Sequence, residues 1–103
     1  MNLGTSISEL RKARNIKQNE LAGLCNITQA YLSLIENNKK EPNLSILKEI
    51  ASKLNVPLPV IFFLSIDKSD IPTGKEEIYE AITPTLKKLI ENVFSYEELA
   101  DKK

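Results

Sequence analysis

The stretch from residue 18 to residue 37, QNELAGLCNITQAYLSLIEN, constrains the fold of this chain more than any other. Its apolar residues recur every three to four positions in two short runs, the spacing that puts side chains on one face of a helix. Leu21, Ala22 and Cys25 lie on one side of the first helix, and Leu32 and Ile35 lie on one side of the second. The pattern predicts two short helices whose apolar stripes face each other.

A tight corner is predicted between these two helices. Asn26 enters the left-handed backbone region more readily than most residues, so it can end the first helix. Thr28 can accept a backbone hydrogen bond as the N-cap of the second helix. Two helices joined by such a short turn form a helix-turn-helix, whose second helix enters the major groove of DNA.

Residues 3 to 66 resemble the core of the Cro/C1 or XRE family of bacterial and phage regulators. The positions that match the family pattern are Gln18, Leu21, Ala22, Ile27, Thr28, Leu32, Ile35, Glu36, Pro42, Leu47 and Ala51. The resemblance implies an all-α fold: a five-helix, lambda-repressor-like DNA-binding bundle in residues 1–66. Residues 67–103 are expected to form a linker and a short helical C-terminal extension. An ordinary helical bundle with no role in DNA binding is the alternative.

The composition argues against an enzyme and against a metal site. The chain of 103 residues has one cysteine and no histidine, which excludes an internal disulfide, Ser-His and Cys-His pairs, and a conventional zinc site. Its three glycines form no phosphate-binding loop. We therefore expect no catalytic residue, no cofactor and no metal.

No targeting or membrane segment is recognised in the sequence. The chain does not start with a basic-then-apolar leader, and the uncharged run from Leu54 to Ile66 is too short to span a bilayer and contains two prolines. We expect a cytoplasmic protein that does not contact membranes.

The charges are unevenly spread, although the net charge is zero. Up to residue 66, eight basic residues against five acidic ones give +3, and from residue 67 onward six against nine give −3. This asymmetry favours a head that faces phosphates and a carboxylate-rich tail.

Capping and stop signals delimit the helices. The first helix is expected to start at Thr5 or Ser6 and to stop at Asn15. The second is expected to start at Lys17 and Gln18, and the third to run from Thr28 to about Asn37. The fourth is expected between an N-cap at Asn43 and a stop at Asn55. A fifth, around Pro59 to Leu64, is apolar on every side, so something beyond the first four helices should cover it.

The C-terminal segment is the expected cover. After a linker from Ile66 to Gly74, Thr73 and Glu76 form a predicted capping box, and Ser95 and Glu98 form another. Thr83 and Pro84 either start a further helix or kink the same one.

The resemblance assigns DNA contacts to named residues. Base contacts are expected from Gln29, whose amide can bond adenine, from Ser33, and from Ala30 and Leu34, which can touch a thymine methyl group. Leu34 departs from the polar or basic residue expected at a base-reading position. Phosphate contacts are expected from Lys17, Gln18, Tyr31, Asn37, Asn38, Lys39 and Lys40. Tyr31 can equally pack on the bundle, and Asn37, Lys39 and Lys40 can belong to a solvated loop. Glu36 is expected to anchor the helix, and Cys25 to fill the core.

The predicted function is a transcriptional regulator that binds double-stranded operator DNA as a homodimer, with recognition helices about 34 Å apart. The dimer contact is expected to use Val60, Phe63, Leu86, Leu89, Ile90, Val93 and Phe94. A protein-interaction module or an antitoxin that retains the fold with weak base readout is the alternative.

Overall fold

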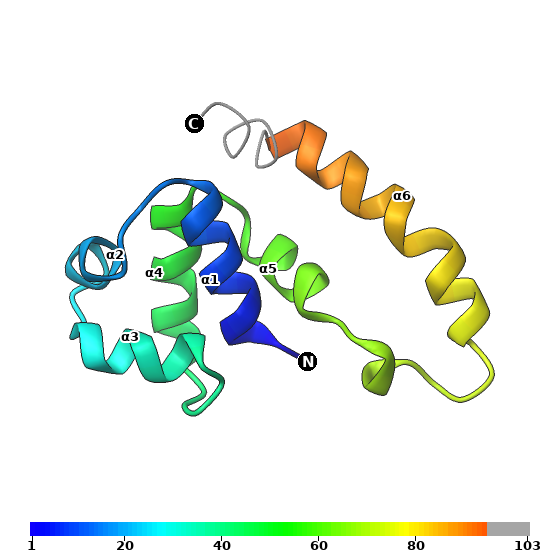
Figure 1. Ribbon diagram of the computed structural model, residues 1–103, viewed down its shortest axis with the longest axis horizontal. Coiled ribbons are helices and arrows are strands. Elements are labelled where there is room, and N and C mark those ends of the chain that lie inside the picture. Colours follow the sequence, from blue (N-terminus) through cyan, green and yellow to red (C-terminus); the bar gives the residue numbers. More distant parts are fainter. Residues whose placement is uncertain (95–103) are drawn as a thin grey trace.

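The computed structural model is all-helical over the residues that it describes, which are 1–94 with the side chain of Phe94 left out. The capping box expected at Ser95 and Glu98 lies outside the described residues. Figure 1 shows a head of five short helices followed by a long sixth helix. Their bounds are α1 (Leu3–Ala13), α2 (Gln18–Leu24), α3 (Gln29–Glu36), α4 (Leu44–Leu54), α5 (Leu58–Ser65), the 3-10 helix η1 (Lys68–Asp70) and α6 (Glu76–Phe94).

The core of the head is formed by the apolar faces that the periodicity predicts. The first helix packs against α3 and α5, and α2 packs against α3 (Figure 1). The large side chains that are fully buried come from five helices: Ile7, Leu10, Leu21, Leu32, Ile35, Ile50, Leu54 and Ile61. Burial of these groups supplies the main stabilisation of the bundle.

Four asparagines end the first four helices in the left-handed conformation. Asn15, Asn26, Asn38 and Asn55 have φ of 62°, 58°, 59° and 59°. Asparagine tolerates this region better than other non-glycine residues, so it can redirect the chain sharply after a helix. The predicted stops at Asn15, Asn26 and Asn55 are confirmed, as is the tolerance expected of Asn38.

The predicted helix starts are confirmed for α2, α3 and α4 and wrong for α1. Thr28 and Asn43 accept the N–H groups of Tyr31 and Ile46 at 3.0 and 2.9 Å. However, α1 starts at Leu3 instead of Thr5 or Ser6, because the N–H of Asn2 donates to the carbonyl of Ser65 at 2.8 Å and holds the chain start against α5.

The capping box expected at Thr73 and Glu76 is also absent from the structure. Glu76 is itself the first residue of α6, and its carboxylate accepts the N–H of Gly74 at 2.8 Å. Pro84 lies inside this helix, so of the two readings left open for Thr83 and Pro84 the single helix is correct.

The sixth helix turns back over the α5 side of the head (Figure 1). Ile90 packs against the core cluster, the hydroxyl of Tyr79 donates to the carbonyl of Ile66 at 3.0 Å, and Lys68 pairs with Glu80 at 3.3 Å. Phe62, Phe63 and Leu64 remain half-buried. The expected cover of α5 is therefore present but partial. Among the described helices, none is long and apolar enough to cross a membrane.

Candidate nucleic-acid interface

The corner between α2 and α3 is held by backbone hydrogen bonds and by the two facing apolar stripes. After α2, the N–H groups of Asn26 and Ile27 donate to the carbonyls of Gly23 and Ala22 at 3.1 and 3.0 Å. The left-handed Asn26 then sends the chain into the N-cap Thr28. The structure confirms the predicted helix-turn-helix, including the residue that makes its turn.

A buried network of polar side chains fixes α3 against α1 and α2. The guanidinium of Arg11 donates from Nε and Nη2 to the two carboxylate oxygens of Glu36 at 2.7 and 3.0 Å, and from Nη1 to the carbonyl of Ile16 at 2.9 Å. The amide of Gln18 donates to the same carboxylate at 3.0 Å. Glu36 thus anchors the helix, as expected, and its charge is compensated inside the protein.

Arg11 was not singled out from the sequence, although a signal was present. It follows Ile7 by four residues, so it lies on the apolar face of α1 that enters the core. A guanidinium on a buried face requires a carboxylate partner. Glu36 is the acidic residue within α3, and α3 is one of the helices that pack against α1.

The outward face of α3 carries all four predicted base-contacting side chains. Gln29, Ala30 and Leu34 are exposed, and Ser33 is half-buried beside them. Two of the neighbouring polar groups are already oriented: the amide of Gln29 donates to Gln18 at 3.4 Å, and the amide of Asn37 donates to the carbonyl and hydroxyl of Ser33 at 2.9 and 3.3 Å. Gln18 therefore joins the buried Glu36 to the exposed Gln29.

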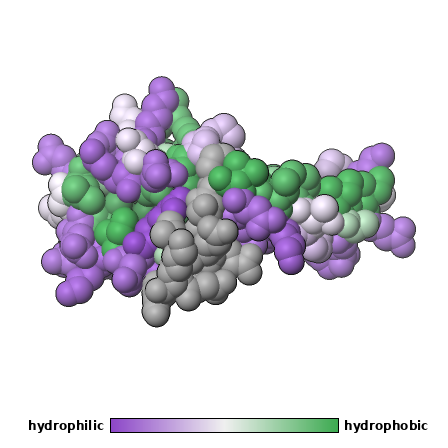
Figure 2. Space-filling model, turned by 90° about the horizontal axis from the view of Figure 1, so that it is seen from above, coloured by the Kyte–Doolittle hydropathy of each residue, from purple (hydrophilic) through white to green (hydrophobic). Residues whose placement is uncertain are grey.

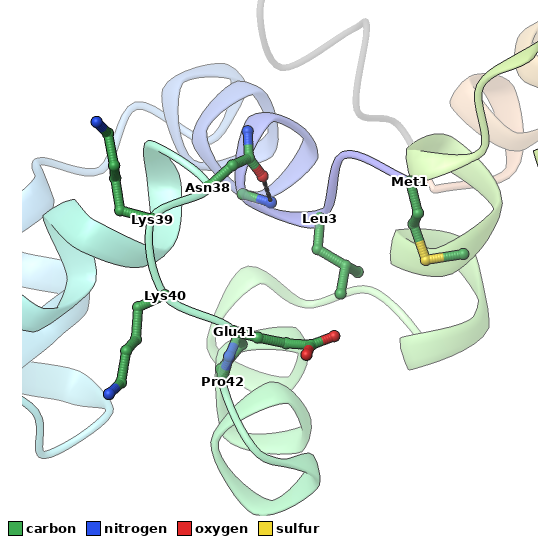
Figure 3. A pocket seen from close by; sticks show the side chains of 8 residues that line it. Met1, Leu3, Asn38, Lys39, Lys40, Glu41 and Pro42 are labelled. Carbon is green, nitrogen blue, oxygen red and sulfur yellow. Dashed lines mark hydrogen bonds between the residues drawn. The ribbon is translucent and has the colours of Figure 1, made fainter. Parts of the chain in front are cut away.

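The predicted phosphate ligands are of two kinds: exposed cations, and polar side chains that already contact other parts of the protein. Lys17, Lys39 and Lys40 are exposed, and Figure 3 shows the last two extending away from the shallow pocket behind their loop. Asn38 instead serves the fold, because its side chain accepts the N–H of Gly4 at 2.9 Å and donates to Thr5 at 3.0 Å. Tyr31 is half-buried against the core cluster, the packing alternative considered from the sequence.

Exposed cations outnumber exposed anions around the corner, with three lysines against the single carboxylate of Glu20 between residues 17 and 40. Between residues 17 and 40 the acidic residues are Glu20 and Glu36, and Glu36 is buried against Arg11. The carboxylate of Glu20 accepts the N–H of Lys17 at 2.9 Å. The arrangement offers amides and a hydroxyl on α3 and exposed ammonium groups at both ends of the helix pair, the chemistry needed for base edges and phosphates.

Comparisons with known proteins agree with this geometry. A family model described as helix-turn-helix matches residues 7–61. The chain is 34% identical over 61 residues to the immunity repressor protein of Bacillus phage phi105, a match that covers 59% of this chain and 42% of that protein. It is 37% identical over 59 residues to the ImmF control region 10 kDa protein of the same phage, covering 57% and 66%. The chain thus spans less than two thirds of either relative.

The fold also resembles a solved structure. The crystal structure of the clp gene regulator ClgR from Corynebacterium glutamicum matches with a TM-score of 0.62 over 87% of each chain, at 19% sequence identity. At this identity the likeness shows the fold alone.

Proposed function

The chain belongs to the helix-turn-helix family of the Cro/C1 (XRE) type, and from this premise we propose that it is a transcriptional regulator that binds operator DNA as a homodimer. The observation that carries the proposal is the outward face of α3. This face is exposed, carries the hydrogen-bonding groups of Gln29 and Ser33, and is held by a buried ion pair beneath it. Such a helix can enter the major groove without rearranging.

Base readout is assigned to the outward face of α3. The amide of Gln29 can bond N6 and N7 of adenine in a bidentate pair, and Gln18 holds that amide in place before DNA binds. The hydroxyl of Ser33 can donate to or accept from several base edges. Gln29 is therefore the side chain expected to discriminate most strongly between base pairs.

Phosphate contacts are assigned to the exposed lysines that flank the helix pair. Lys17 precedes α2, and Lys39 and Lys40 follow α3, so the cations stand at both ends of the helix-turn-helix. Asn37 adds a neutral donor beside them. Contacts of this kind release condensed counterions, so affinity should fall steeply with salt.

The dimer contact is assigned to α6, which has an apolar face turned away from the head. Ile78, Ile82, Leu86, Leu89 and Val93 follow one another at intervals of three or four residues and are between 38% and 64% exposed. Figure 2 shows hydrophobic side chains gathered in a band along the upper edge of the lobe where α6 lies. An unpaired stripe of this length along a helix is typical of a helix–helix interface.

This surface revises the interface residues expected from the sequence. Leu86, Leu89 and Val93 belong to the exposed stripe, and Ile78 and Ile82 extend it. Phe63 is half-buried on α5 and can lie at its edge. Val60 is buried in the head and Ile90 packs on the same core, so both are left out of the proposed interface. The side chain of Phe94 lies outside the described residues.

Charges along α6 favour an antiparallel pair. Glu76, Glu77 and Glu80 give its first half a charge of −3, whereas Lys87 and Lys88 against Glu91 give its second half +1. Two copies that run in opposite directions would bring the acidic half of each helix towards the basic half of the other. The two-fold axis of such a pair matches a palindromic operator with half-sites one helical turn, or a multiple of it, apart.

The proposal is tested by selecting bound sequences from a random duplex pool, with the wild-type protein and with Gln29→Ala. A palindromic consensus that loosens at one base pair in each half-site for the variant is the expected result. Leu24→Ala, which removes an exposed side chain from α2, should leave the consensus unchanged. No enrichment at low salt would contradict the proposal and favour the protein-interaction module or antitoxin, since a partner held by apolar burial shows little salt dependence.

A further inference from the structure

The outward face of α3 consists of two parallel rows with different chemistry. Gln29, Ser33 and Asn37 follow one another at intervals of four residues and form a polar row, joined by the hydrogen bonds between Asn37 and Ser33. Ala30 and Leu34, also four residues apart, form an apolar row beside it. Residues four apart lie one above the other on a helix surface, so each row is a continuous strip.

Leu34 is the large apolar side chain of this face. It is 47% exposed, although it belongs to a helix whose other large aliphatic residues, Leu32 and Ile35, are 0% and 1% exposed. Its backbone is held firmly, because its carbonyl accepts the N–H groups of Lys39 and Lys40 at 2.9 and 3.2 Å. The same hydrogen bonds tie the two cationic residues to the end of the helix, so a phosphate contact there would set the position of Leu34.

Leucine cannot take part in the hydrogen-bond pattern of the major groove. The apolar group displayed by bases in that groove is the C5-methyl group of thymine, and 5-methylcytosine carries a methyl group at the same ring position. We propose that Leu34, with Ala30 beside it, binds the C5-methyl group of a pyrimidine and so determines part of the sequence specificity. This inference rests on the proposed function, because it requires α3 to enter the major groove.

The spacing of the row limits where the methyl groups can lie. Four residues of α-helix rise about 6 Å, and successive base pairs are about 3.4 Å apart. Ala30 and Leu34 can therefore reach methyl groups no more than about two base pairs apart. The polar row reads hydrogen-bonding edges over the same stretch. A half-site is then expected to combine an adenine facing Gln29 with a methylated pyrimidine facing Leu34.

The test removes or adds a methyl group without changing any hydrogen bond. The consensus duplex obtained by selection is remade with deoxyuridine in place of thymidine, one position at a time, and with 5-methylcytosine in place of each cytosine. The proteins compared are the wild type, Leu34→Ala and the control Leu24→Ala, whose side chain is 52% exposed on α2. Binding is measured at one fixed salt concentration.

If thymine is the ligand, deoxyuridine at one position in each half-site should weaken wild-type binding about fourfold per methyl group lost from an apolar contact. If cytosine occupies the position, its replacement by 5-methylcytosine should instead strengthen wild-type binding about fourfold. Either effect should vanish in Leu34→Ala and persist in Leu24→Ala. A second variant, Leu34→Gln, should shift the selected base at that position, which a variant that merely unfolded could not do.

The inference is overturned if every methyl replacement changes the binding of the wild type and of Leu34→Ala by the same factor. In that case the consensus itself still supports the proposed function. Failure of the wild type to select any sequence would overturn the proposed function, together with the inference that rests on it. The two failures are therefore distinguished by the first step of the experiment.

Discussion

The carboxylate of Glu36, at the end of α3, accepts two hydrogen bonds from the guanidinium of Arg11 on α1, at 2.7 and 3.0 Å, with side chains that are 4% and 10% exposed. The same carboxylate accepts a third bond from Gln18 on α2. One buried anion thus fixes the mutual positions of the three helices around the proposed DNA-binding surface. Its pairing with Arg11 also keeps this negative charge inside the protein, away from the surface proposed to face phosphates.

Removing the guanidinium should destabilise the fold strongly. Arg11→Met leaves Glu36 buried with a neutral amide as its remaining donor, and breaking a buried ion pair costs about 3 kcal/mol. Urea unfolding followed by circular dichroism measures the change. Lys53→Met, which breaks an exposed pair with Glu49 at 3.6 Å, is the control and should change the stability by less than about 1 kcal/mol. Equal effects of the two variants would show that the buried pair has no special role.

Two glycines should respond oppositely to replacement by alanine. A Cβ added at Gly4 would lie 1.9 Å from the carbonyl oxygen of Ile35, so α1 and α3 would have to separate, at a cost of about 2 kcal/mol or more. A Cβ at Gly23, inside α2, meets nothing within 4 Å, and alanine there should stabilise the protein by roughly 0.5–1 kcal/mol. Thermal unfolding of the two variants gives the comparison. Similar midpoints would contradict the close packing of α1 on α3.

Salt dependence should report the contacts made by Lys40. If each subunit of a dimer loses one phosphate contact in Lys40→Gln, the slope of log affinity against log salt should become shallower by about 1.8. Binding to the selected duplex is titrated between low and moderate salt. Lys75→Gln, which changes an exposed lysine just before α6, serves as the matched control and should leave the slope unchanged. An unchanged slope in Lys40→Gln would remove this side chain from the interface.

A charge placed in the apolar stripe of α6 should separate the proposed dimer. Leu89 is 57% exposed, so Leu89→Lys should fold normally yet lose self-association, because a buried unpaired ammonium is costly at an interface. Sedimentation at low micromolar concentration measures this, with Leu44→Lys, which changes a 55% exposed leucine on α4, as the matched control. A wild-type protein that stays monomeric at high micromolar concentration would refute the dimer altogether.

The stability should fall in mildly alkaline solution because of Cys25. Burial, followed by the negative charge of Glu49, raises the pKa of its thiol, while Lys53 opposes the shift. The folded state therefore holds its proton more tightly than the unfolded state, whose thiol has a pKa of about 8.5. The corresponding stability is complete below that pH and is lost as the pH rises above it. Urea unfolding from pH 8 to pH 10 should show a steeper decline for wild type than for Cys25→Ala; parallel curves would contradict the shift.

Local signals in the sequence were sufficient to predict most helix boundaries of the head. The apolar periodicity of the motif helices, the N-caps Thr28 and Asn43, and the left-handed stops at Asn15, Asn26 and Asn55 all depend on residues within a few positions of one another. Each such signal is a local backbone or side-chain preference that agrees with the tertiary structure at that residue. The predicted first helix failed at its start, where a long-range bond from Asn2 to Ser65 overrides the local capping preference.

The spacing of residues in the sequence was enough to predict the helix-turn-helix and the outward face of its second helix, because helical spacing alone decides which residues share a face. Tertiary structure decided the rest. The pairing of Arg11 with Glu36 joins residues 25 positions apart, and no local rule specifies a partner at that distance. Likewise, α6 has apolar residues on more than one face, and only its packing shows that Ile90 turns inward while Leu86, Leu89 and Val93 stay exposed. Which apolar face of α6 becomes buried depends on the assembled core, and the sequence pattern of the helix alone does not distinguish between these faces.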